Sequence, residues 1–356
     1  MRDIKNKLTS GKNTKNIKPR RGKMFGYQVL GFGAGGVAPL FITATGGTVV
    51  TVGDFKVHRF NGNGCFEVTC AGNAGGSNSV DYMVVAGGGG GGGYPGNGGA
   101  GAGGMRLGAV CAQPSIPTRA PGYSVTATTY PIVIGAGGTP GKYSQSPRNG
   151  GQGGNSSGLG FTAAGGGYGV QGCGNKPGAN GGSGSGGTMN CASPGGSGNT
   201  PPVSPVQGHN GGTGAPASSN CTGGGGGGGS KLAGGTGYNS GPANPAPGGS
   251  AAGSGGNGVN VSPIFGCAPK GFYNGNNGCS GSSADGIFAG GAGGSVYWGN
   301  PAPGGQGGGA NGAVNSEGAG KSGTENSGGG GAGTSALPAA AGAGGSGVVL
   351  IRYKFQ

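Results

Sequence analysis

Residues that could carry out catalysis are few in this chain and lie far apart in the sequence. The seven carboxylates and two histidines are Asp3, Asp54, Glu67, Asp81, Asp285, Glu317, Glu325, His58 and His209. Asp54 and Glu67 fall in neighbouring expected strands, which is typical of solvated strand faces and not of an acid–base pair. Matches to the G-x-G-x-x-G pattern recur, but no strand–loop–helix unit of the kind that binds dinucleotides is predicted around them. We therefore expect no enzymatic activity and no cofactor.

Eight cysteines are scattered along the chain without the spacing of a metal site. They are Cys65, Cys70, Cys111, Cys173, Cys191, Cys221, Cys267 and Cys279. Because there is no C-x-x-C pair and no Cys/His cluster, we expect no zinc site. The thiols could form disulfides in an oxidising compartment or be buried as small apolar groups. We expect some of them to pair.

A basic arm begins the chain and carries much of its net charge of +14. Its basic residues are Arg2, Lys5, Lys7, Lys12, Lys15, Lys18, Arg20, Arg21 and Lys23, against one acidic residue in the same stretch. Such an arm can anchor a protein on an acidic partner, although a solvated tail has the same composition. It holds a single Arg-Gly dipeptide and no interleaved aromatics, so nucleic acid is not an expected partner. No run of about 18 apolar residues occurs, so no membrane insertion is expected.

Aromatic residues stand alone among small residues in the glycine-rich part of the chain. In such a setting an aromatic ring either fills a gap between packed segments or offers a flat face to a sugar or a protein. Two pairs, each with Gly and Asn nearby, suggest loop tips that contact a receptor. These candidates are Phe272, Tyr273, Tyr297 and Trp298.

The elements that must position these residues follow from an unusual composition. Glycine supplies 105 of 356 residues, and only 8 % are charged. Glycine disfavours helices, and the strict G-X-Y period of collagen is absent. Alternating or continuous apolar patterns predict strands at both ends of the chain and at two internal places. The expected strands are Thr48–Val52, Asp54–Phe60, Cys65–Cys70, Val80–Ala86, Tyr123–Ile134, Phe161–Ala164 and Gly347–Tyr353.

Between residues 87 and 346 about one residue in three is glycine. Glycine lets extended polyproline-II-like segments approach closely and bond laterally through their main chains. A flexible linker is the alternative, but linkers of this length are uncommon within compact domains. We therefore expect a mainly β protein with essentially no α-helix, built from a small split β-sandwich-like unit and a polyglycine-II bundle. The expected divisions are a basic arm and anchoring segment (1–44), the β-unit (45–86 with 347–356) and the glycine-rich insertion (87–346).

An ordered set of motifs resembles a glycine-rich domain found in phage tail fibres and related viral structural proteins. The set comprises Gly53–Phe60, Val80–Gly90, Val133–Gly138, Phe161–Gly167 and Gly347–Tyr353. The resemblance spans about residues 45–353, and the eight cysteines depart from the pattern that we associate with the family.

The resemblance implies a virion structural protein, exposed on the particle as a tail-fibre or adhesin subunit. It also implies that the arm binds other virion proteins and that the insertion points toward a host-surface receptor such as a glycan. Fibre proteins generally favour homotrimers. The alternatives are a capsid-surface fibre or decoration protein, and a non-viral ice-binding or matrix protein.

Overall fold

The computed structural model describes most of the chain from residue 38 onward. The described residues are 38–111, 115–116, 119–144, 146, 148–172, 175–189, 192–216, 223–238, 252–266, 272, 286–296, 301–313, 318–334 and 339–356.

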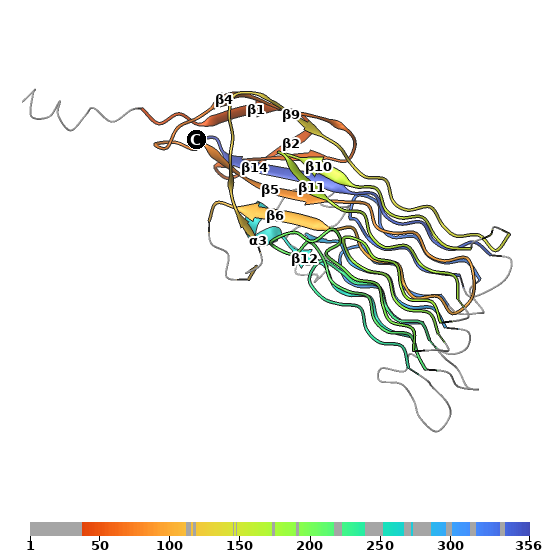
Figure 1. The fold of residues 1–356 in the computed structure, drawn as a ribbon. Helices are drawn as coiled ribbons and strands as arrows, with labels where there is room; N and C mark the ends of the chain where they lie inside the picture. The colour runs from red at the N-terminus through yellow and green to blue at the C-terminus, as the bar shows by residue number, and fades with distance from the viewer. Residues whose placement is uncertain are drawn as a thin grey trace, which may run out of the picture.

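Two β-sheets lie at one end of the molecule (Figure 1), and from here on the two sheets together are called the β-unit. The β-unit is larger than the expected 45–86 with 347–356, because it begins at residue 42 and includes strands between residues 105 and 132. The larger sheet has the order β2-β3-β14-β5-β6-β7, with β8 paired to β5. Its strands are β2 (Thr48–Val52), β3 (Phe55–Phe60), β5 (Ser79–Val85), β6 (Met105–Ala109), β7 (Ala120–Pro121), β8 (Tyr123–Ser124) and β14 (Val348–Lys354). The smaller sheet has the order β1-β4-β9, made of β1 (Ile42–Thr45), β4 (Gly64–Ala71) and β9 (Thr129–Ile132). The C-terminal strand β14 thus lies between β3 and β5 and joins the two ends of the chain.

The expected fold class is confirmed: the protein is mainly β, and α3 (Ser262–Phe265) has only four residues. The strands expected near both ends are present as β2, β3, β4, β5 and β14. The expected single strand over residues 123–134 is wrong, because it is divided into β8 and β9. Strands β1 and β6 were not expected. Among the described residues, no helix combines the length and the apolarity that a membrane span would need.

The larger sheet is covered by apolar side chains on both faces. Along β14, Val349, Ile351 and Tyr353 pack toward the smaller sheet, with residues such as Phe66 of β4. The alternate residue Leu350 packs on the opposite face. This period of two is the pattern of a strand buried on both sides.

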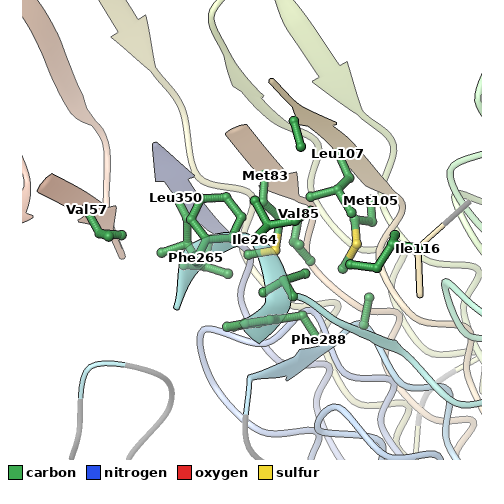
Figure 2. Packing of buried hydrophobic residues seen from close by; sticks show 14 of the residues in the cluster. Val57, Met83, Val85, Met105, Leu107, Ile116, Ile264, Phe265, Phe288 and Leu350 are labelled. Carbon is green, nitrogen blue, oxygen red and sulfur yellow. The ribbon is translucent and has the colours of Figure 1, made fainter. Parts of the chain in front are cut away.

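The face that carries Leu350 is closed by residues from the glycine-rich stretch (Figure 2). Ile264 and Phe265 of α3 and Phe288 of β13 (Ile287–Phe288) pack there in one cluster with Met83. β13 pairs with β12 (Val259–Asn260). Pro263 suits the first turn of α3 because its fixed φ is already helical and no donor is needed there. The β-unit therefore takes part of its core from the long stretch between its two halves.

The glycine-rich stretch forms a bundle of extended segments that run away from the β-unit (Figure 1). Residues 86–93, here called the central helix, show its organisation. Backbone N–H groups of this segment donate to residues 148–154 in the pairs Gly87–Gly154, Gly90–Gly151 and Gly93–Arg148, at 2.9, 2.9 and 2.7 Å. Each step of three residues along one segment moves three residues back along the other. The two segments are therefore antiparallel and have three residues per turn, as in polyglycine II.

The other residues of the central helix bond to other segments in the same way. Its N–H groups also donate to residues 101–104 and 342–345. Its carbonyls accept from residues 138–141, 166–169 and 331–334. Among the described residues, six neighbouring segments thus surround it, and each face of the central helix meets another backbone.

This packing explains why the central helix is almost pure glycine. A Cβ placed on Gly87, Gly90 or Gly91 would lie 2.0 Å from the carbonyl oxygen of a neighbouring segment. No side chain fits at that distance. By contrast, a Cβ on Gly62, in the turn between β3 and β4, would meet no atom within 4 Å.

Outer segments carry side chains at every third position. Along residues 133–142, the exposed positions are Val133, Ala136, Thr139 and Lys142, while Gly135, Gly138 and Gly141 are buried. A period of three is what a helix with three residues per turn produces when one face meets solvent.

Asparagines complete the hydrogen bonding at the outside of the bundle, where there is no further backbone to accept from an N–H group. Their Oδ1 atoms accept from backbone N–H groups of adjacent segments in the pairs Asn155–Gly165, Asn180–Ser197, Asn210–Gly198, Asn257–Gln306 and Asn311–Gly304, at 2.7 to 2.9 Å. Each side chain thus satisfies a donor that would otherwise depend on water.

The short hairpin of β10 (Ser156–Gly158) and β11 (Phe161–Ala163) connects two bundle segments over the β-unit. Phe161 stacks on Tyr82 of β5, with ring centroids 4.4 Å apart. This contact ties the root of the bundle to the sheet core.

Candidate functional site

One end of the bundle is joined to the sheets, and the other end consists of turns. Residues 86–93 leave β5 and residues 97–104 return to β6, while residues 134–141 leave β9 and residues 149–155 return to β10. The turns between them must therefore lie at the end farthest from the sheets, which we call the distal end (Figure 1, lower right). The first described residues and the C-terminus lie at the β-unit end.

Two distal turns bring two tyrosines and an arginine together. The Arg148 guanidinium lies 4.1 Å from the ring centroid of Tyr143 and 5.3 Å from that of Tyr94. The two tyrosine rings are 6.2 Å apart. Residues Tyr94, Tyr143 and Arg148 are here called the tyrosine–arginine cluster, and all three are partly exposed.

Hydrogen bonds fix the arginine in this position. Its Nε donates to the carbonyl of Tyr143 at 2.8 Å. Its backbone N–H donates to Oε1 of Gln171 at 3.1 Å, and its carbonyl accepts from Gly93 at 2.7 Å. The side chain is therefore held by stacking and by its Nε, while no hydrogen bond of its two terminal amino groups occurs among the described residues. A guanidinium in this state can bind a carboxylate or phosphate through two parallel hydrogen bonds.

Charge at the distal end has one sign among the described residues. Lys142 is exposed beside Tyr143, and Lys176 follows another distal turn. The four described carboxylates, Asp54, Glu67, Asp81 and Glu325, lie in the β-unit or at the turn beside it. An anionic partner would therefore meet attraction at the described turns, where no described carboxylate competes.

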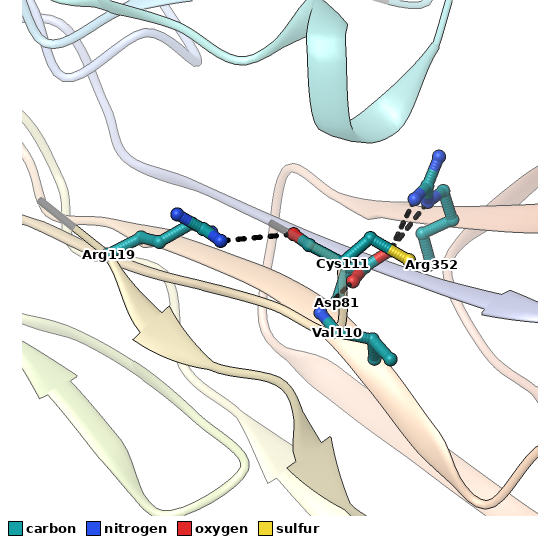
Figure 3. A network of polar contacts seen from close by, with 5 residues as sticks. All are labelled: Asp81, Val110, Cys111, Arg119 and Arg352. Atoms are coloured by element: carbon teal, nitrogen blue, oxygen red, sulfur yellow. Dashed lines mark hydrogen bonds and ion pairs between the residues drawn. The ribbon is translucent and has the colours of Figure 1, made fainter. Parts of the chain in front are cut away.

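The β-unit has its own polar network around Asp81 (Figure 3). Its Oδ2 accepts from Nε of Arg352 at 2.7 Å and pairs with Nη2 at 2.6 Å. Its Oδ1 accepts from the N–H of Val110 at 2.7 Å, and Arg119 donates to the carbonyl of the next residue, Cys111, at 3.2 Å. These bonds attach β14 and the chain after β6 to β5. Both carboxylate oxygens of Asp81 are used within the fold, so we interpret the network as structural.

His58 is fully buried where β1 passes into β2. Its Nδ1 lies 2.7 Å from the carbonyl of Gly46, and its Nε2 lies 3.2 Å from the hydroxyl of Tyr353. Burial lowers the pKa of His58, and the charge of Lys56 adds to this, while the Gly46 carbonyl acts in the opposite direction. The ring is therefore neutral in the folded protein near pH 7 and acts as a core group. Among the described residues, no three His, Cys, Asp or Glu side chains gather as a metal site requires.

Most of the residues proposed from sequence as contacts lie outside the described residues. This holds for the nine basic residues of the arm and for Tyr273, Tyr297 and Trp298. Phe272 is described and is only 7 % exposed, packed in the core cluster of the β-unit. Arg59 lies over its ring, 5.1 Å from the centroid, and donates to its carbonyl. Phe272 is therefore a packing residue and not the exposed loop-tip contact that its sequence context suggested.

The cysteines are only partly described. Cys65, Cys70 and Cys111 are free thiols. Cys173, Cys191, Cys221, Cys267 and Cys279 lie outside the described residues, so pairing among them stays a prediction.

Sequence reasoning did not identify the tyrosine–arginine cluster. In the sequence, Tyr94 and Tyr143 stand as isolated aromatics in the glycine-rich stretch, and nothing in the local pattern marks Arg148. A usable signal was present, because each tyrosine lies within three residues of a Pro-Gly turn dipeptide.

Comparison with known proteins identifies a family for this chain. No curated protein matches the chain. Residues 60–354, from the end of β3 to the end of β14, match the model of a family described as a glycine-rich domain. Since this match covers the closing strand and the whole glycine-rich stretch between the halves of the sheet, the chain belongs to the glycine-rich domain family.

Proposed function

We propose that this protein is a virion structural protein, a phage tail-fibre or adhesin subunit that presents its distal turns to a receptor on the host surface. The observation that carries the proposal is that the two ends of the molecule differ. The β-unit, at one end, contains the first described residues and the C-terminus. The bundle, which is held together by main-chain hydrogen bonds, places a set of turns at the opposite end.

A scaffold of this kind suits recognition for a physical reason. Backbone hydrogen bonds fix the segments, so the turns are positioned before a partner arrives and little ordering entropy is lost on binding. Loops carried on a rigid scaffold tolerate changes of sequence, so the turn side chains can be adapted to a receptor while main-chain hydrogen bonds hold the bundle.

The basic arm completes the proposal with an anchoring role. Residues 1–23 precede the β-unit, and their excess positive charge suits an acidic surface on another virion protein. Homotrimer formation and exposure on the particle surface belong to the same proposal.

Binding of the purified full-length chain to cells tests the receptor role. The fluorescently labelled chain is incubated with a panel of bacterial strains, with and without excess unlabelled chain. We expect saturable, competed binding to at least one strain. Absence of such binding across the panel, together with inhibition of ice recrystallisation, would instead favour the ice-binding alternative.

Deletion of residues 1–23 tests the anchoring role separately. The shortened chain should bind cells as the full chain does, but should not be incorporated into particles when it is the only copy supplied. Unchanged incorporation would contradict an anchoring role for the arm.

A further inference from the structure

We propose that the tyrosine–arginine cluster (Tyr94, Tyr143 and Arg148) is a binding site for an anionic saccharide, in which Arg148 binds a carboxylate or phosphate and the tyrosines contact the sugar. This inference rests on the proposed function, because it names the chemical class of the receptor that the distal turns recognise.

The first argument is the state of Arg148. Stacking at 4.1 and 5.3 Å from two ring centroids and the bond from Nε to the Tyr143 carbonyl restrict its rotamers. A surface arginine normally loses considerable side-chain entropy when it binds, and here much of that loss has already occurred. The terminal amino groups are the part of the guanidinium that binds an oxyanion in two parallel bonds.

The second argument is the setting of the cluster. It lies on two adjacent turns at the distal end, and its three side chains are partly exposed. Tyrosine rings offer apolar faces with a polar edge, which suits the mixed surface of a sugar ring. The cluster therefore combines tyrosines that can contact a sugar ring with an arginine that can bind a charged substituent of the same sugar.

The third argument is selectivity by charge. Lys142, next to Tyr143 in the sequence, is an exposed cation, and the described carboxylates lie toward the β-unit. The rest of the described bundle surface is mostly Asn, Gln, Ser, Thr, Ala and Pro. A neutral glycan would gain nothing from this local charge, whereas an acidic one would be attracted to it.

The competing explanation is that Arg148 only joins two turns. Cation–π contacts at exposed sites contribute about 0.5–1 kcal/mol, so such a role is physically sufficient to account for the stacking. It predicts no ligand affinity, and the two explanations therefore differ in a direct binding experiment.

Calorimetric titration of the full-length chain with defined oligosaccharides provides that experiment. The probes are an oligogalacturonate, its methyl ester as the neutral counterpart, and a phosphorylated mannose oligosaccharide. We expect at least one acidic probe to bind and the methyl ester to bind at least tenfold more weakly than the oligogalacturonate if the carboxylate is the group recognised. Binding of the phosphorylated probe alone would identify phosphate as that group. No binding of either acidic probe would overturn the proposal.

Variants then assign the site. Arg148→Gln should weaken binding of the acidic probe at least tenfold. Arg148→Lys keeps the charge but cannot donate two parallel hydrogen bonds, so it should weaken binding to an intermediate extent. Lys231→Gln removes one exposed positive charge beside β12, at the other end of the bundle, and should change affinity less than twofold. Equal losses in Arg148→Gln and Lys231→Gln would show diffuse attraction and overturn the site. If Arg148→Gln does not fold, as judged by its thermal melt, the Arg148→Lys variant decides.

The same variants separate this inference from the proposed function. If the wild-type chain binds no cells, the receptor role fails. If it binds cells and Arg148→Gln binds them equally well, the receptor role stands and the saccharide site fails.

Discussion

The β-unit is ordered mainly by its side chains, whereas the bundle is ordered mainly by its main chain. In the β-unit, buried side chains such as Leu350, Phe265 and Phe66 form layers on either side of a sheet. In the bundle, the central helix has almost no side chains and is ordered by hydrogen bonds to six neighbouring segments. Removing atoms should therefore damage the first region, and adding atoms should damage the second.

This difference has a thermodynamic basis. Ordering a backbone costs about 1–2 kcal/mol per residue in either region. The β-unit offsets that cost by burying apolar side chains, each of which contributes about 1.5–3 kcal/mol. The bundle instead uses close packing and main-chain bonds, whose net value is about 0.5–1.5 kcal/mol each. Its stability is thus spread over many small contributions that all require backbones to touch.

The largest effect is expected from adding one methyl group to the central helix. In Gly90→Ala the new Cβ would lie 2.0 Å from the carbonyl oxygen of Thr139, so the backbones must separate and several hydrogen bonds must lengthen. We expect a loss of more than about 4 kcal/mol in the free energy of unfolding, measured by chemical denaturation.

Gly62→Ala is the matched control, since its Cβ would meet nothing within 4 Å. We expect a change within about 0.5 kcal/mol for that variant. Similar stabilities for Gly90→Ala and Gly62→Ala would contradict the view that contact between backbones orders the bundle.

The next largest effect is expected from removing a core side chain in the β-unit. Leu350→Ala leaves a cavity between the larger sheet and α3, and should cost about 2–5 kcal/mol. The corresponding removal in the bundle, Ala332→Gly, takes a methyl group from a small cluster with Ala292 and Ala310 and should cost about 1 kcal/mol. Denaturant melts of both variants give the ratio of the two losses in the free energy of unfolding. Equal losses would contradict the view that the two regions are stabilised differently.

The two regions also differ in how far sequence predicts them. Strands β2, β3, β4, β5 and β14 were predictable because each carries an alternating or continuous apolar pattern with a definite register. In the bundle, the buried glycines of residues 133–142 recur every three residues, and the all-glycine run of the central helix indicates a segment enclosed on every face. Which segments are neighbours was not predictable, because a glycine carries no side chain to specify a partner.

The candidate site shows the same limit. Tyr94 and Tyr143 lie beside turn signals, so their place at turns follows from local sequence. Their meeting with Arg148 depends on the order of segments in the bundle, which glycine does not encode. For Phe272 the local sequence predicted an exposed contact, but the residue is buried. Its burial depends on Arg59 and the sheet, which are far away in the sequence.

A smaller effect is expected from pH, and it should originate in the β-unit. The pKa of His58 is lowered in the folded protein from its usual value of 6.5, so the unfolded chain takes up a proton more readily. Stability should therefore fall as pH decreases below about 6.5, by at most about 1.4 kcal/mol per pH unit, and should level off above that range. Denaturant melts between pH 5.5 and 7.5 measure this slope. In His58→Gln the slope should largely disappear, and an unchanged slope would exclude His58 as its source.

The smallest effect is expected at the outer surface of the bundle, where a side chain substitutes for a missing neighbouring backbone. Asn155→Ala removes the Oδ1 that accepts from the Gly165 N–H at 2.9 Å, and should cost about 1 kcal/mol because water reaches this position in part. Asn155→Asp keeps an acceptor there and should cost less. A triple variant that also replaces Asn180 and Asn210 with alanine should lose about three times as much, since each serves a different N–H group. If Asn155→Ala and the triple variant both melt as the wild type does, the asparagines are ordinary surface residues and the bundle needs no side chains to close its outer faces.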